Sequence, residues 1–76
     1  MKDLLIYIVS YLVDYPDAIT VDEIEQGDEI TLELRVAKED MGKVIGRQGR
    51  IAKEIRTIMR SAANRYNKRV SVEIIG

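Results

Sequence analysis

The sequence predicts a single α+β domain in which three helices cover one face of a three-stranded sheet. The chain has 76 residues, a length that suits one domain and leaves no room for a second. Apolar residues recur at helical spacing in some segments and alternate with polar residues, as in strands, in others. These segments follow the order helix, strand, strand, helix, helix, strand (α-β-β-α-α-β). We therefore expect residues 1–76 to form one helical layer packed on one sheet.

The N-terminal segment is expected to form an amphipathic helix. Its apolar residues recur at helical spacing and are Leu4, Leu5, Ile8, Val9 and Leu12, with Tyr7 and Tyr11 beside them. Pro16 sets the expected end of this helix because it disfavours helical geometry at Tyr15. The run is not typical of a secretory signal, since Asp3 cancels the charge of Lys2, and its ten residues are too few to span a bilayer. We therefore expect a soluble cytoplasmic protein.

A β-hairpin is expected next. Ile19 and Val21 mark a strand in an acidic run, and residues 26–28, Gln-Gly-Asp, supply turn chemistry. Apolar and polar residues then alternate from Ile30 to Val36, which predicts the second strand of the pair.

Two helices and a closing strand are expected after the hairpin. A short helix is predicted from Lys38 to Ile45, with Glu39 and Asp40 in its first turn, where carboxylates favour the helix dipole. It stops at Gly46. The longest helix is predicted over residues 50–66, and its apolar face holds Ile51, Ile55, Ile58, Met59, Ala62 and Tyr66, with Lys53, Arg56 and Arg60 opposite. Alternation over residues 70–74 predicts the last strand.

Charge is divided between the two halves of the chain. The net charge is -1, but residues 1–33 hold one Lys and nine acidic residues, whereas residues 34–76 hold eleven Lys and Arg and four acidic residues. The basic half suits a polyanion, and the acidic half would limit indiscriminate binding to one. The alternative, that both halves are simply solvated surfaces, stays open until a specific anion site is found.

The composition argues against most kinds of enzyme. The chain has no Cys and no His, which excludes a disulfide scaffold, a cysteine zinc site, a thiol nucleophile and the commonest general base. The carboxylates between Asp22 and Glu29 are divided between the two faces of a strand and do not match a calcium loop, so we interpret them as a solvated acidic edge. We expect no metal, no cofactor and no catalytic residues.

The informative stretch runs from Gly42 to Ile51. Gly46 and Gly49 lie between two predicted helices, where they allow a tight turn and let a ligand approach the main chain. The amides at the start of the long helix favour an anion such as phosphate, and cationic side chains lie close by: Lys43, Arg47, Arg50 and Lys53. The pattern predicts an electropositive, glycine-lined helix junction.

Other phosphate-binding motifs do not fit this stretch. A P-loop needs Gly-Lys followed by Ser or Thr after a second glycine, and a dinucleotide-binding loop needs a glycine in place of Val44. The tyrosines are scattered at positions 7, 11, 15 and 66, so a sheet that stacks bases on aromatic residues is also disfavoured.

The run from Val44 to Ile51, between two helices and followed by Ile55, resembles the signature of the KH domain, whose GxxG loop clamps four backbone nucleotides of a single strand. The order of elements resembles the type II, bacterial arrangement of that fold. The segment Val36–Lys43 that leads into the signature resembles the small stand-alone bacterial KH proteins. The resemblance covers essentially the whole chain and is weakest in the N-terminal helix.

This resemblance implies an RNA groove between the glycine loop and a sheet edge. The implied RNA-binding residues are Lys43, Ile45, Gly46, Arg47, Gln48, Gly49, Arg50, Ile51 and Lys53. An apolar floor under the bases is implied for Ile45, Ile51, Ile55 and Val36, for which ordinary core packing is the alternative. A solvated basic surface is the alternative for the cations.

The leading hypothesis is a non-enzymatic module that binds short single-stranded RNA with low sequence selectivity. The resemblance further implies an RNA chaperone or post-transcriptional regulator that dimerises, either with itself or with a larger KH-containing protein, because two linked sites raise avidity. The alternative is a protein-interaction adaptor in which the fold serves to dimerise and RNA contact is incidental.

Overall fold

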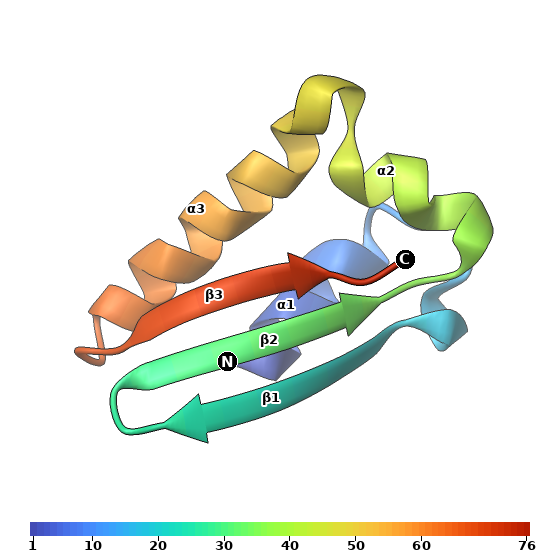
Figure 1. Ribbon diagram of the computed structural model, residues 1–76. Helices are drawn as coiled ribbons and strands as arrows, with labels where there is room; N and C mark the ends of the chain where they lie inside the picture. The colour runs from blue at the N-terminus through green and yellow to red at the C-terminus, as the bar shows by residue number, and fades with distance from the viewer.

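The computed structural model describes all residues 1–76 and has the predicted order of elements (Figure 1). The helices are α1 (Lys2–Ser10), α2 (Met41–Ile45) and α3 (Arg50–Asn64), and the strands are β1 (Thr20–Gln26), β2 (Glu29–Arg35) and β3 (Arg69–Ile74). Short 3₁₀ turns lie at Pro16–Ala18, Lys38–Asp40 and Arg47–Gly49. None of the helices combines the length and the apolar composition that crossing a membrane requires.

The sheet is mixed, with the strand order β1-β2-β3. The hairpin strands β1 and β2 are antiparallel, and Gly27, at φ +59°, takes the first position of their two-residue turn. The strand β3 lies parallel to β2, which requires a crossover connection, and α2 and α3 provide it. This crossover places the glycine loop at one end of the sheet, above the C-terminal ends of β2 and β3 (Figure 1).

The core lies between the sheet and the three helices, which confirms the predicted fold class. One face of the sheet is buried, as its alternating buried residues show: Val21, Ile30, Leu32, Leu34, Val70 and Val72. The helices cover this face with Leu5 and Val9 from α1, Val44 from α2, and Ile55 and Met59 from α3. The opposite face is open and carries mainly polar side chains, with the exposed Ile24 among them.

The first helix is shorter than the sequence predicts, because α1 ends at Ser10 and not before Pro16. The Ser10 hydroxyl donates to the Tyr7 carbonyl, and the amides of Tyr11 and Leu12 bond three residues back, so the last turn tightens and the chain leaves the helix. The prediction failed because proline marks only the latest point at which this helix can end.

The apolar face predicted for the long helix is rotated in the structure. The most buried side chains of α3 are those of Ala52, Ile55, Met59 and Ala63. Ile58 is 45% exposed and Tyr66, beyond the helix end, is 71% exposed. Both were predicted to lie on the buried face of the helix. In the structure they lie instead beside that face, on the side toward α1.

Candidate nucleic-acid interface

The glycine loop joins α2 to α3 through a backbone that only glycine can follow at its first position. Gly46 has φ +76° and ψ 174°, and a Cβ there would meet the side chain of Ile51 and come within 2.9 Å of its backbone nitrogen. Gln48 and Gly49 then adopt the left-handed conformation at φ +58° and +75°, and α3 begins at Arg50. Gly46 therefore serves close packing, whereas Gly49 serves the backbone turn alone, since a Cβ there would enter open space.

The start of α3 has no side-chain cap. Its N-cap residue is Gly49, which has no side chain to accept the first amides of the helix, and the Gly49 amide itself bonds back to the Gly46 carbonyl at 3.2 Å. The amides of the first turn therefore have no side-chain acceptor, and the positive end of the helix dipole adds to their attraction for an anion.

Three cations surround this helix start without partners. Arg47, Arg50 and Lys53 are exposed, and their side chains take part in none of the five ion pairs and make no hydrogen bond. Their charges are therefore available to an external anion. The structure brings these residues together with the glycine loop, as the sequence predicts.

Lys43 differs from the other predicted cations because two carboxylates hold it. Its Nζ lies 3.1 Å from Oδ2 of Asp14 and 3.4 Å from Oδ1 of Asp40. The hydrogen bond to Asp14 is the main cause that raises the pKa of Lys43. The charge of Lys43 is thus balanced inside the protein, and it contributes less to the free positive charge of the site than its sequence position suggests.

Asp40 has a role that the sequence did not reveal. Its side chain is completely buried and accepts hydrogen bonds from the backbone amides of Asp14 and Tyr15, each at 3.0 Å. Burial acts to raise the pKa of Asp40, but these amides and Lys43 outweigh it and hold the pKa below its ordinary value. The expectation that Asp40 mainly favours a helix dipole was incomplete, because Asp40 ties the loop after α1 to the start of α2.

The four residues predicted as an apolar floor do not behave alike. Ile55 is buried in the core, so the packing alternative applies to it. Ile45 is 38% exposed, and Ile51 and Val36 are half-buried. Ile45 and Ile51 flank the loop and remain accessible to a ligand that approaches it.

Two further cations lie on the same flank of α3 and were left out of the predicted site. Arg56 and Arg60 follow Arg50 and Lys53 at intervals of three and four residues, which places all four along one side of the helix. A cavity of about 360 Å³ continues this side between α3 and the start of β3, where Arg60, Asn64 and Arg69 line it. The helical spacing of the four cations was the signal in the sequence that could have revealed this extension.

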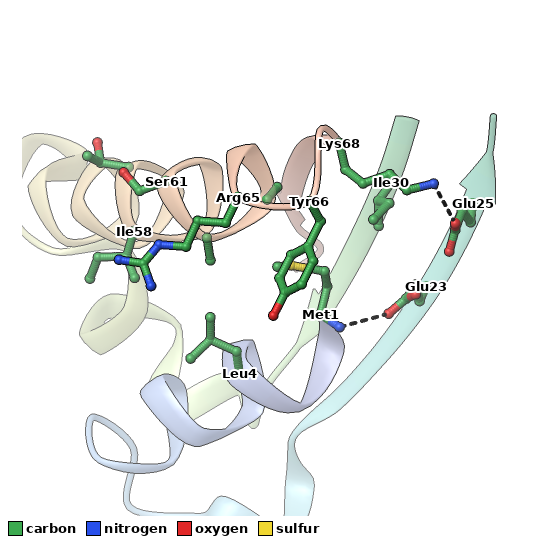
Figure 2. Close-up of a pocket in the computed structure, with 13 residues that line it drawn as sticks. Met1, Leu4, Glu23, Glu25, Ile30, Ile58, Ser61, Arg65, Tyr66 and Lys68 are labelled. Carbon is green, nitrogen blue, oxygen red and sulfur yellow. Dashed lines mark hydrogen bonds and ion pairs between the residues drawn. The ribbon is translucent and has the colours of Figure 1, made fainter. Parts of the chain in front are cut away.

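A second surface lies on the other flank of α3, between α3 and α1. It is an apolar groove of about 850 Å³ whose lining includes Met1, Leu4, Ile58, Ala62 and Tyr66. Figure 2 shows Leu4 from α1 opposite Ile58 and Tyr66, with ion pairs from the Met1 amino group to Glu23 and from Lys68 to Glu25 at its rim. No residue of the glycine loop lines this groove.

The family model and the similar proteins that match this chain all belong to one family. The sequence model described as "KhpA/KhpB, KH domain" matches residues 2–74. The chain is 60% identical over 75 residues to the RNA-binding protein KhpA of Clostridium acetobutylicum, covering 99% of this chain and 100% of that protein. It is 55% identical to the RNA-binding protein KhpA of Clostridium perfringens, with the same coverage, and 44% identical to that of Listeria monocytogenes, covering 99% of each chain. No solved structure was found to match.

Proposed function

The chain belongs to the KhpA/KhpB family of KH domains, and from this premise we propose that it is a non-enzymatic protein that clamps short single-stranded RNA at the glycine loop. The observation that carries the proposal is the uncapped start of α3, surrounded by the unpaired charges of Arg47, Arg50 and Lys53. An uncapped helix start with free cations is a binding site for phosphate.

In the proposed clamp, backbone amides bind phosphates and side chains contact sugars or bases. Phosphates pass along residues 46–49, where the missing side chains of the glycines allow close approach to the amides of α3. Ile45 and Ile51 contact sugars or bases, and Gln48, which is exposed, is free to hydrogen-bond a sugar. Lys43 belongs to the proposed site by position, although its charge is already balanced by Asp14 and Asp40.

We further propose that the protein acts as a dimer, in the cytoplasm, as an RNA chaperone or post-transcriptional regulator. A footprint of about four nucleotides gives one domain little affinity, and a second linked site raises avidity without new contacts. The apolar groove between α1 and α3 supports a dimer, because it exposes Ile58 and Tyr66 in a small domain with a thin stability margin. The partner is a second copy or the larger KH-containing protein KhpB (Jag).

The same groove favours a second candidate function. If its occupant is the main partner, the protein is a protein-interaction adaptor, and RNA contact at the glycine loop is incidental.

The salt dependence of RNA binding tests the proposal. Three unpaired cations that neutralise three phosphates give a slope of about -2 for the logarithm of affinity against the logarithm of salt, at about -0.7 per phosphate. Arg50→Gln should reduce the size of this slope by about 0.7. The control is Arg35→Gln, which removes an exposed arginine paired with Asp22 on the open face of the sheet and should leave the slope unchanged. A flat titration, or equal effects of both variants, favours the adaptor.

A further inference from the structure

The free edge of β3 carries backbone groups on the same side of the molecule as the cationic flank of α3. β3 pairs only with β2, and the amides of Arg69 and Ile75 bond to carbonyls on the β2 side. In a parallel ladder, alternate residues face the partner strand, so the N–H and C=O groups of Val70, Val72 and Ile74 face away from it. This edge lies beside α3, which packs over β3 (Figure 1).

Arg56 bridges α3 to this edge. Its Nε donates a hydrogen bond of 3.1 Å to the Val72 carbonyl. A guanidinium has five N–H donors, and this bond uses the one on Nε. The four N–H groups of the two terminal NH₂ groups remain free at the outer edge of the guanidinium. No carboxylate pairs with Arg56, so its charge is not balanced inside the protein.

Arg56 is also correctly placed along the path of the RNA. It lies six residues after Arg50 in α3, which is about 9 Å along the helix axis from the start that we propose as a phosphate site. Arg50, Lys53 and Arg56 lie on the same flank of the helix. A strand held at the glycine loop and running along this flank would bring a base to the free edge of the Arg56 guanidinium.

We propose that Arg56 reads one base of the bound RNA and selects cytosine or guanine at that position. This inference rests on the proposed function and deepens it. An anchored guanidinium presents two parallel N–H donors, and its complement is a base edge with two adjacent acceptors. Cytosine offers O2 and N3, and guanine offers O6 and N7. On adenine and uracil, donors and acceptors alternate, so one N–H of the fork would face a donor.

The bond to Val72 is what makes Arg56 more selective than the other cations of the stripe. A free arginine side chain loses much rotamer freedom when it binds, whereas Arg56 is already restrained by its anchor. Lys53 makes no side-chain bond, and Arg60 Nε reaches only the Arg56 carbonyl at 3.5 Å on its own helix. These residues can attract phosphate but are not held beside the strand edge.

The test compares base preference between two conservative variants. Equal-length single-stranded RNAs made of C only, A only and U only, and a U strand with one central G, are titrated against the wild-type protein, Arg56→Lys and the matched control Arg60→Lys. The wild type should bind the C strand and the G-containing strand about tenfold more tightly than the A and U strands. Arg56→Lys keeps the charge but loses the planar fork, so the preference should fall to about twofold or less while affinity for the U strand and its salt slope persist. Arg60→Lys should keep the full preference.

Three results would overturn the proposal: a wild type that binds all strands equally, an Arg56→Lys variant that keeps the preference, or an Arg60→Lys variant that loses it. If Arg56 serves only to hold α3 on β3, Arg56→Lys lowers the melting temperature and leaves base preference intact. Failure of the RNA clamp itself is distinguishable, because then the U strand shows no salt-dependent binding to the wild type.

Discussion

The double substitution Arg47→Asp and Gln48→Asp tests the proposed RNA binding at the glycine loop separately from the stability of the fold. Neither side chain takes part in an ion pair or a side-chain hydrogen bond, and both glycines are kept. Gln48 lies at φ +58° and ψ 25°, a left-handed conformation that aspartate tolerates better than most residues. Carboxylates near the start of α3 also suit the helix dipole. The stability should therefore change by no more than about 0.5 kcal/mol.

The loss of RNA affinity follows from the change of charge. The substitutions change the charge at the loop by three units, two at position 47 and one at position 48. At about 6 Å in water, each unit is worth about 0.7 kcal/mol against a phosphate, or about 2 kcal/mol in total. Salt removes roughly half of this, and the lost charge-assisted hydrogen bond of Arg47 adds about 1.5 kcal/mol. The sum of about 2.5 kcal/mol predicts a loss of affinity of roughly 60-fold.

Fluorescence anisotropy with a labelled single-stranded RNA measures this loss, and a thermal melt measures the stability. The melting temperature should stay within about 4 °C of the wild type. The control Arg47→Gln with Gln48→Asn keeps similar shapes and changes the charge by one unit, so it should lose clearly less affinity. A folded double-aspartate variant that binds RNA as tightly as the wild type would remove the loop from the mechanism.

Three further predictions concern the loop, the buried acid and the groove. Gly46→Ala should destabilise the protein by about 2 kcal/mol or more, because its Cβ meets the start of α3, whereas Gly49→Ala should cost only about 1 kcal/mol of backbone strain; chemical denaturation measures both. Asp40 has a folded-state pKa below its unfolded value of 3.8, so its contribution to stability is present above that pH and is lost as the pH falls through the lower folded value. Asp40→Asn should therefore lower the melting temperature at pH 7 and reduce the fall of the melting temperature at acid pH. A variant whose melting temperature falls in acid as steeply as that of the wild type would contradict this. Ile58→Glu should yield monomers in sedimentation, while Ile24→Glu, at a residue 46% exposed on the open face of the sheet, should not; equal behaviour of the two variants would argue against the groove as the dimer surface.

The order and type of the elements could be predicted from the sequence because they depend on local patterns. Alternation over β2 and β3 and the apolar stripe of α3 are properties of neighbouring residues, and the glycines at positions 27 and 46 mark turns through their own backbone freedom. The end of α1 could not be predicted in this way. It depends on the hydrogen bond that the Ser10 hydroxyl donates and on a loop whose amides donate to Asp40, just before α2. Neither leaves a periodic signal.

The structure places the glycine loop and its flanking cations together, as the sequence predicts, but the sequence did not reveal the pairing state of each cation. Lys43 and Arg47 look equivalent in the sequence, since both are cations within the same ten residues. Lys43 is balanced by Asp14, which lies 29 positions earlier, and by the buried Asp40, while Arg47 has no partner. Such pairings depend on which segments meet in the folded chain.

A small α+β domain with an electropositive glycine loop between two helices could be predicted from the amino-acid sequence, because turn chemistry, periodicity and charge are local properties. Packing of the folded chain makes β3 parallel to β2 with a free edge beside α3, brings Arg56 to that edge and leaves Ile58 facing an open groove. Because α3 packs its central apolar stripe on the sheet, its two flanks have different neighbours. A helical period places residues on a face, but only packing decides what that face meets.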